Sequence, residues 1–259
     1  FLKKSIKKIK PKIVFHLAAQ SSVIESFKNS EKTMLTNVIG TANVLEAIKN
    51  DKNVKCLIII TTDKVYQNYK FKKYFDESSV LGGDDVYSGS KACCEILTNS
   101  YKKSFFSNKN CKIATVRAGN CFGGGDWTKD RIVKDSLESF FNNKVLVIRN
   151  PNATRPWQHV LEAVGGYLCL AINLKYNKNL HGESFNFGPG LSKEYSVLEL
   201  IKATSNHWEK ISWKKIKRSK NFFHESELLR LNCNKAKKIL KWKSILRFDE
   251  IVEMTANWY

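Results

Sequence analysis

A phenol and an ammonium group lie four residues apart in the segment Tyr87-Ser-Gly-Ser-Lys91. Side chains at this spacing share one face of a helix, so both groups can reach the same ligand. The lysine charge favours the phenolate and predicts a pKa for Tyr87 that is lowered toward neutrality. Tyr87 is therefore a candidate general base for a hydroxyl group that is being oxidised. The spacing alone is common by chance, so the assignment depends on the residues that accompany it.

A hydroxyl, a carboxyl and an amine follow one another at Thr62-Asp63-Lys64, after the apolar run Val54–Ile60. Together these groups can bind a hydroxyl and transfer protons, although an ordinary polar turn can have the same composition. Their occurrence in one chain with Tyr87 and Lys91 favours the catalytic interpretation.

Alternating strands and helices must position these groups. The apolar patterns of the first half predict strand, helix, strand, helix and strand at Ile13–Leu17, Lys32–Lys49, Val54–Ile60, Tyr87–Phe106 and Lys112–Val116. This order indicates an α/β fold with a Rossmann-like, doubly wound parallel sheet. Ligands bind such sheets at the carboxyl ends of the strands. We therefore expect Gln20–Ser22, Thr61–Lys64 and Arg117–Asn120 to meet there.

The pattern changes after Asn120. A glycine loop is followed by a predicted helix and strand at 130–142 and 145–149, then by another helix and strand at 160–174 and 183–187. We expect residues 1–120, with 160–190 returning to them, to form the sheet domain. Residues 121–159 and 191–259 would form a smaller C-terminal substrate-binding region, with a mainly helical tail.

Composition narrows the class of protein. The chain has 259 residues and a formal net charge of +20, but its basic residues are scattered and accompany no nucleic-acid-binding motif. A lysine-rich solvated surface is therefore favoured over binding to nucleic acid or a membrane. No apolar run approaches the roughly 20 residues that cross a bilayer. Seven cysteines without a CxxC pair predict a reducing cytoplasm, with neither a disulfide framework nor a metal site.

Short motifs occur in the order typical of extended short-chain dehydrogenase/reductase enzymes that act on nucleotide sugars. They are His16-Leu-Ala-Ala-Gln20, Asn37-Val-Ile-Gly-Thr41, Thr62-Asp63-Lys64-Val-Tyr66, Tyr87–Lys91 and Arg117-Ala-Gly-Asn120. Two longer stretches, 117–132 and 148–160, resemble the CDP-glucose 4,6-dehydratase family and contain the rare residues Trp127, Trp157 and His159. The resemblance extends over essentially the whole chain.

That family opens with a strand and a glycine-rich fingerprint that binds the dinucleotide pyrophosphate at a helix N-terminus. No such motif occurs in this sequence. The resemblance therefore implies that roughly 80 residues, with the first βαβ units, precede Phe1 in the intact domain.

The resemblance implies NAD as cofactor and CDP-glucose as substrate. In the implied reaction, Tyr87 takes the O4 proton while C4 is oxidised, and Thr62 binds O4. Asp63 protonates the departing O6 hydroxyl, which requires a carboxyl group that burial keeps protonated. Lys64 acts at C5, either as the base or by stabilising the enolate. The product is a 4-keto-6-deoxy sugar.

Further site residues follow from the same resemblance. Lys91 would tune Tyr87 and bind the nicotinamide ribose, and the other cofactor contacts would be Leu17, Ala18, Ala19, Gln20, Asn37, Thr61 and Tyr87. Substrate contacts would be Ser21, Asn120, Arg131, Arg155 and His159. A bidentate guanidinium suits diphosphate oxygens. A purely structural role for His159 stays open.

Other functions are compatible with part of this pattern. A dehydratase for another nucleotide sugar is the nearest alternative, and a 4-epimerase would not need Asp63 and Lys64. A catalytically silent binding module would not need all the reactive groups together. The residues do not specify whether the product enters lipopolysaccharide O-antigen deoxysugars. Because the family is usually dimeric through two long helices, here Lys32–Lys49 and Tyr87–Phe106, we expect a homodimer.

Overall fold

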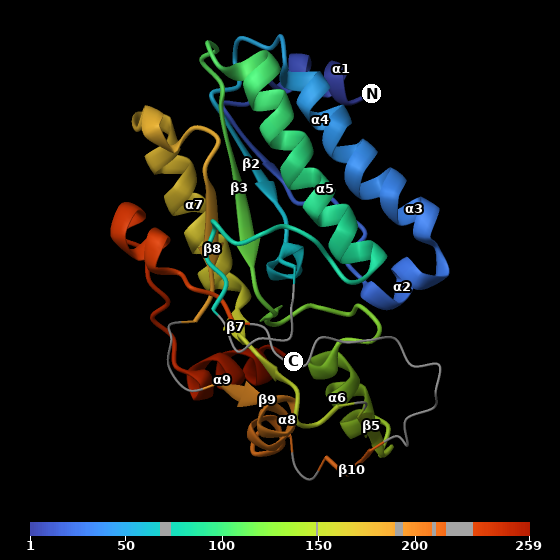
Figure 1. The fold of residues 1–259 in the computed structure, drawn as a ribbon. Coiled ribbons are helices and arrows are strands. Elements are labelled where there is room, and N and C mark those ends of the chain that lie inside the picture. The colour runs from blue at the N-terminus through green and yellow to red at the C-terminus, as the bar shows by residue number, and fades with distance from the viewer. Residues whose placement is uncertain (68–73, 149, 190–193, 209–210, 216–229) are drawn as a thin grey trace.

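A parallel four-stranded sheet in the order β1-β2-β3-β8 organises the chain (Figure 1). Its strands are β1 (Ile13–His16), β2 (Cys56–Ile60), β3 (Lys112–Ala118) and β8 (Ser184–Phe187), and all three pairings are parallel. The structure is a computed structural model that describes residues 1–67, 74–148, 150–189, 194–208, 211–215 and 230–259. Because all pairings in the sheet are parallel, the carboxyl ends of its four strands share one edge of the sheet.

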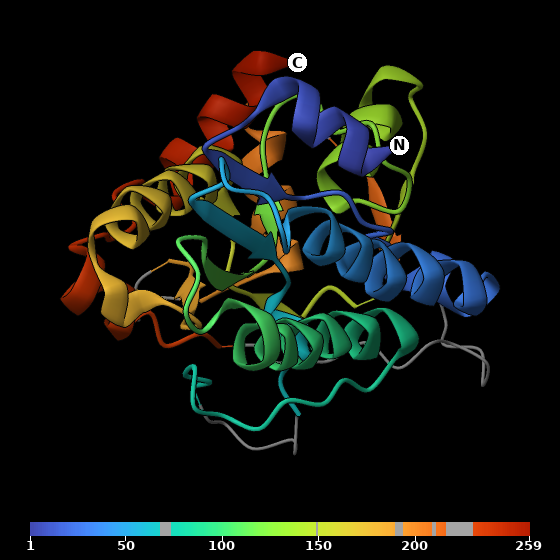
Figure 2. The same cartoon turned by 90° about the horizontal axis from the view of Figure 1, so that it is seen from above.

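Helices cover both faces of this sheet (Figure 2). One face carries α1 (Leu2–Ile9), α2 (Val23–Lys28), α3 (Ser30–Met34), a π-helical turn (Leu35–Ile39), α4 (Gly40–Ile48) and α5 (Val86–Tyr101), which continues into a second π-helical turn (Lys102–Phe106). The opposite face carries α7 (Val160–Tyr176) and a third π-helical turn (Ala236–Leu240). The predicted α/β doubly wound class is thereby confirmed.

Side chains that alternate along β2 build a core on each face. Leu57 and Ile59 pack with α4, whereas Cys56 and Ile58 pack with α7. Successive strand residues point to opposite faces, so a strand buried on both sides is apolar throughout. This explains why the sequence has an unbroken apolar run at this position.

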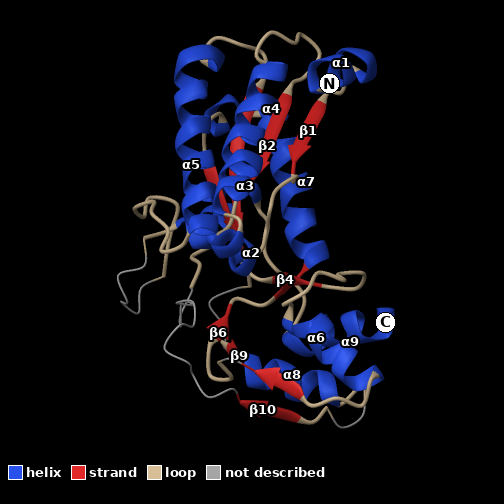
Figure 3. Ribbon diagram, turned by 90° about the vertical axis from the view of Figure 1, so that its right-hand side faces the viewer, coloured by secondary structure: helices blue, strands red, loops and turns tan. Residues whose placement is uncertain are grey.

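A second lobe lies beyond the carboxyl edge of the sheet (Figure 3). Its helices are α6 (Ile132–Phe141), α8 (Val197–Ser205) and α9 (Phe248–Trp258). Its short strands pair as β4 (Cys121–Phe122) with β7 (Gln158–His159), β5 (Leu146–Ile148) with β10 (Trp213–Lys215), and β6 (Thr154–Arg155) with β9 (Tyr195–Ser196). A separate apolar core that includes Trp157 and Trp208 holds this lobe together.

The predicted strands and helices of the first half are confirmed, and the described part of the tail is mainly helical as predicted, with interruptions. Residues 241–247 contain no helix. The buried carboxylate of Glu162 accepts hydrogen bonds from the hydroxyl of Ser244 at 2.7 Å and from the amides of Ile245 and Leu246 at 2.6 and 2.9 Å. These amides are satisfied by a distant side chain and need no helix to pair with.

Two adjacent glycines of α7 test how this helix packs on β8. A methyl group at Gly166 would lie 2.4 Å from Cδ1 of Phe187, whereas one at Gly165 would meet nothing within 4 Å. We expect Gly166→Ala to lower the free energy of unfolding by about 1–3 kcal/mol through overpacking. Gly165→Ala should raise it by up to about 1 kcal/mol, because alanine favours the helix. Urea titration measures both, and shifts of the same sign would contradict this packing.

Candidate active site

The turn that follows β2 holds three of the predicted catalytic groups. Asp63 is 1% exposed, and its Oδ1 accepts a hydrogen bond from the Thr62 hydroxyl at 3.0 Å. The Lys64 ammonium lies 3.6 Å from the same oxygen. Asp63 Oδ2 has no hydrogen-bond partner in the part of the chain that the structure describes. A buried carboxyl oxygen of this kind can bind a group that a ligand brings.

The first turns of α5 bring Tyr87 and Lys91 to the same strand end. Both side chains are buried, and the Lys91 ammonium donates to the carbonyl of Ile60, the last residue of β2, at 3.0 Å. The Thr62 hydroxyl lies close enough to the Tyr87 phenol to lower its pKa. The structure therefore brings Thr62, Asp63, Tyr87 and Lys91 together, from two segments that are far apart in sequence.

The expected lowering of the Tyr87 pKa is wrong for this structure. Burial raises the pKa of Tyr87 to about 12, despite the Thr62 hydrogen bond and the Arg131 charge, which both lower it. The Lys91 ammonium is directed to the Ile60 carbonyl, and burial lowers the pKa of Lys91. Burial thus favours the neutral phenol of Tyr87, and added positive charge beside it would favour ionisation.

Asn37 ties the segment after β1 to α5. Its Oδ1 accepts from the Gln20 amide at 2.8 Å, and its Nδ2 donates to the Gln20 carbonyl at 3.0 Å and to the Ser90 hydroxyl at 2.8 Å. The predicted cofactor residues 17–19 come directly after β1, with Leu17 and Ala18 exposed. They lie at the same edge of the sheet as the Thr62–Lys64 turn.

Three predicted substrate residues lie where the two lobes meet. The Arg131 guanidinium is 3.3 Å from the Ser21 carbonyl and 3.4 Å from its hydroxyl, so it spans the second lobe and the segment after β1. Asn120 follows β3, and its Nδ2 is buried without a hydrogen-bond partner among the described residues. The side chains of Arg131 and Asn120 thus both lie near the boundary between the lobes.

Other predicted residues are engaged elsewhere. The Thr61 hydroxyl donates to Glu95 at 2.6 Å, inside the sheet domain. His159 Nδ1 accepts from the amide of Leu161 at 3.3 Å and caps α7, which is the structural role that the sequence left open. Arg155 is buried in β6, where its guanidinium donates to the Thr154 carbonyl at 2.8 Å.

Sequence reasoning missed a buried ion pair behind the site. Glu95 and Arg117 join through two contacts of 2.9 and 3.0 Å. A usable signal was present, because Glu95 continues the helix face of Tyr87 and Lys91 by one more turn. The sequence places its partner Arg117 at a strand end but does not indicate the ion pair.

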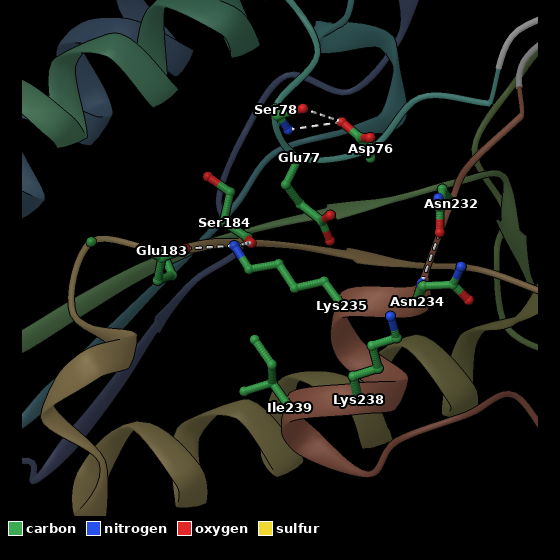
Figure 4. Close-up of a pocket in the computed structure, with 11 residues that line it drawn as sticks. Asp76, Glu77, Ser78, Glu183, Ser184, Asn232, Asn234, Lys235, Lys238 and Ile239 are labelled. Atoms are coloured by element: carbon green, nitrogen blue, oxygen red, sulfur yellow. Dashed lines mark hydrogen bonds and ion pairs between the residues drawn. The ribbon is translucent and has the colours of Figure 1, made fainter.

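A cavity of about 670 Å³ lies on the outer side of β8 and contains none of the predicted catalytic residues. It is lined by Glu77, Ser184 and Lys235 among others, and the Lys235 ammonium donates to the Ser184 carbonyl at 2.9 Å (Figure 4). Within the described residues, no group of His, Cys, Asp and Glu side chains is arranged to hold a metal ion. No described helix is long and apolar enough to cross a membrane.

The fold matches solved structures of nucleotide-sugar enzymes. It superposes with a TM-score of 0.85 on a UDP-glucuronic acid 4-epimerase from Bacillus cereus in complex with UDP-glucuronic acid and NAD, at 22% identity over 99% of this chain and 77% of that one. On a dTDP-glucose 4,6-dehydratase from Bacillus anthracis in complex with NAD, the TM-score is 0.81, at 21% identity over 100% of this chain and 75% of that one. The architecture is therefore that of Rossmann-type epimerases and dehydratases.

Sequence comparison specifies the family. A family model described as GDP-mannose 4,6 dehydratase matches residues 1–255. A CDP-glucose 4,6-dehydratase from Salmonella typhimurium is 39% identical over 264 residues, which cover 100% of this chain and 73% of the relative. The chain belongs to the GDP-mannose 4,6 dehydratase family, and as a nucleotide-sugar 4,6-dehydratase it is a hydro-lyase. The resemblance seen in the sequence is confirmed.

The partly buried His16 beside this site gives a test by pH. Its Nε2 lies 3.1 Å from the Thr41 hydroxyl, and burial, with a smaller effect of the Lys91 charge, lowers its pKa to about 4. The pKa of His16 in the unfolded chain is about 6.5, so above that pH its stabilising contribution to the free energy of unfolding is fully present. This contribution is lost as the pH falls from about 6.5 through the folded pKa of about 4. We expect His16→Gln to reduce the loss of unfolding free energy between about pH 7 and 4.5 by about 2 kcal/mol. Urea titrations at both pH values measure it, and an unchanged pH dependence would contradict the buried neutral state.

Proposed function

We propose that the protein converts CDP-glucose to CDP-4-keto-6-deoxyglucose with NAD as its cofactor. The observation that carries this proposal is the buried convergence of Thr62, Asp63, Tyr87 and Lys91 at one strand end. The family model's description names GDP-mannose, whereas the relative at 39% identity is a CDP-glucose enzyme. The direct similarity to a single enzyme over the whole chain favours the cytidine sugar.

The residues at the sheet edge fit the nicotinamide end of NAD. An ammonium has three donors, and Lys91 gives one of them to the Ile60 carbonyl. The others suit ribose hydroxyls. The small side chains of Ala18 and Ala19, held in place through Asn37 and Gln20, suit the approach of a flat ring. Bound NAD supplies reversible uptake of a hydride.

Tyr87 and Thr62 are proposed to act on the O4 hydroxyl of the sugar. The Thr62 hydroxyl next to Tyr87 would orient O4, and the phenolate form of Tyr87 would take its proton. Burial raises the pKa of Tyr87, so this step depends on the charge that the complex adds near the phenol. Arg131 already acts in the required direction by lowering that pKa.

Asp63 and Lys64 are proposed to act at C6 and C5. Asp63 Oδ1 is engaged by Thr62 and Lys64, while Oδ2 has no partner among the described residues. We assign to Oδ2 the proton transfer to the departing O6 hydroxyl. Lys64, close to this carboxyl group, would take the C5 proton as a neutral amine, and the ammonium that results would stabilise the enolate.

Substrate phosphates are proposed to bind where the lobes meet. Arg131 reaches Ser21 across that boundary, and a guanidinium suits phosphate oxygens. The unpartnered Asn120 amide would donate to the same ligand. For His159, the cap on α7 supports a structural role in place of direct substrate binding.

We further propose that two chains associate through the helices opposite α7. Leu35 and Ile39 are 54% and 49% exposed in the π-helical turn, and Ile96 is 57% exposed on the neighbouring α5. Figure 2 shows these two helical segments side by side at one surface of the molecule. Adjacent exposed apolar side chains of this kind are typical of an interface between protein chains.

The substrate proposal is tested with the full-length protein and four nucleotide sugars. The protein would be incubated with NAD and, separately, CDP-glucose, dTDP-glucose, UDP-glucose or GDP-mannose. The alkali-induced absorbance of the 4-keto-6-deoxy product reports the reaction. Product from CDP-glucose alone is expected. Product from another sugar would move the substrate assignment, and no product from any of them would overturn the proposed dehydration.

Two variants separate the proposed steps. Tyr87→Phe should lower the rate of C4 oxidation at least about 100-fold, because the proton acceptor is lost. Asp63→Asn should still permit C4 oxidation but stall the elimination, so reduced cofactor accumulates in a single turnover. Stopped-flow absorbance measures both steps. Normal product formation by Asp63→Asn would exclude it as the acid, and normal oxidation by Tyr87→Phe would exclude that base.

The proposed association surface is tested by introducing charged side chains into it. Leu35→Glu combined with Ile96→Glu should convert a dimer into a monomer in sedimentation velocity, because two charges would be buried at the interface. The matched control is Leu168→Glu, at a 51% exposed position on α7, which should remain dimeric. A monomeric wild-type protein, or dissociation caused by the control as well, would refute this surface.

A further inference from the structure

The Glu95 carboxylate is a junction between four elements of the sheet domain. It lies on α5, and it accepts hydrogen bonds from Thr61 at 2.6 Å and from Thr115 at 2.6 Å. The Ser184 hydroxyl donates to it at 3.2 Å, and the guanidinium of Arg117 binds both of its oxygens at 2.9 and 3.0 Å. These partners come from the end of β2, from β3 and from β8.

Arg117 extends the junction to the far side of the catalytic turn. Its Nη1 donates to the phenol oxygen of Tyr66 at 2.9 Å, and that phenol donates to Asn186 Oδ1 at 2.6 Å. Tyr66 comes directly after the short helical turn Asp63–Val65, whereas Thr61 comes directly before Thr62. The ion pair therefore holds the residues on both flanks of the Thr62–Lys64 turn.

The pair stays charged although it is buried. Burial alone would raise the pKa of Glu95, but Arg117 and the hydroxyls of Thr115 and Thr61 outweigh this effect and hold that pKa below its usual value. Hydrogen bonds to ionised groups are short and strong, so the carboxylate is fixed in direction as well as in charge.

We propose that Glu95 and Arg117 are positioning residues, which fix the Thr62–Lys64 turn relative to Tyr87 and Lys91. Glu95 lies on the same helix face as Tyr87 and Lys91, two turns beyond Tyr87. The Glu95–Arg117 pair thus fixes the rotation of α5 about its axis and its position along the sheet, and the same pair holds the Thr62–Lys64 turn. The activity part of this proposal rests on the proposed dehydration. A displacement of about 1 Å in a catalytic group can lower a rate about 100-fold.

The test removes single hydroxyl groups from the junction and leaves the ion pair intact. Glu95→Gln would leave the buried Arg117 charge unpaired, and loss of folding would then obscure its effect on geometry. Thr61→Val and Tyr66→Phe each remove one anchor of the turn. Thr115→Val is the matched control, because its hydroxyl also donates to Glu95 at 2.6 Å but belongs to β3. Thr61→Ser keeps the anchoring hydroxyl.

We expect Thr61→Val and Tyr66→Phe to lower kcat by about 10- to 100-fold with KM changed less than about two-fold. Thr115→Val should change kcat less than about three-fold at a similar melting temperature, and Thr61→Ser should recover most of the kcat that Thr61→Val loses. Equal losses in all three hydroxyl-deleted variants, or losses that follow melting temperature, would reduce the junction to a structural role and overturn the proposal.

Amide hydrogen exchange of residues 62–66, measured without ligands, gives a readout that does not depend on the reaction. Exchange there should accelerate in Thr61→Val and Tyr66→Phe but not in Thr115→Val. If the wild-type protein fails to dehydrate any nucleotide sugar, the proposed function fails, and exchange alone decides the positioning role. If exchange in this segment is the same in all variants, the positioning role is overturned whatever the activity.

Discussion

The interior of the sheet domain contains a charged pair, Glu95 of α5 with Arg117 of β3, to which the end of β2, β3 and β8 are hydrogen-bonded. Replacing such a pair by apolar residues is often neutral for stability, whereas removing one partner is strongly destabilising. The role that we propose for the Glu95–Arg117 pair is therefore to fix the relative positions of the elements that it joins. Apolar packing tolerates small shifts of a helix over a sheet, but a bidentate contact between a carboxylate and a guanidinium does not. Tyr87 and Lys91 occupy the preceding turns of α5, and the Thr62–Lys64 turn follows the end of β2.

Burial gives these groups their positions and also shapes their chemistry. The Tyr87 phenol sits among buried groups, and this environment raises its pKa to about 12 instead of lowering it. The Lys91 ammonium, expected to assist the phenol, is directed to the Ile60 carbonyl. Burial therefore favours the neutral phenol, and positive charge placed beside it would favour ionisation.

The second lobe faces the candidate catalytic groups across the carboxyl ends of the strands. It has its own apolar core, and its contacts with the sheet domain include the reach of Arg131 to Ser21 and the bonds of Glu162 to residues 244–246. Glu162 belongs to α7, which packs on the sheet, so this carboxylate fastens the C-terminal segment to the sheet domain. These contacts join the two lobes beside the candidate site.

Local sequence determined the elements and the reactive groups of this protein. The apolar run Cys56–Ile60 specified a strand buried on both faces, and the spacing of Tyr87 and Lys91 placed both on one helix face. The order of strands and helices was sufficient for the doubly wound class, because parallel strands need crossover connections. Motif resemblance then named the chemistry, and the similarity to known dehydratases confirmed it at the level of the family.

Tertiary structure decided what depends on contacts between distant residues. The direction of the Tyr87 pKa shift, the engagement of the Thr61 hydroxyl by Glu95 and the non-helical segment 241–247 all follow from partners far away in the sequence. Desolvation and hydrogen bonding are properties of a three-dimensional environment, and spacing along the chain does not report them. The sequence therefore specified which groups are present, whereas packing determined their partners and their ionisation.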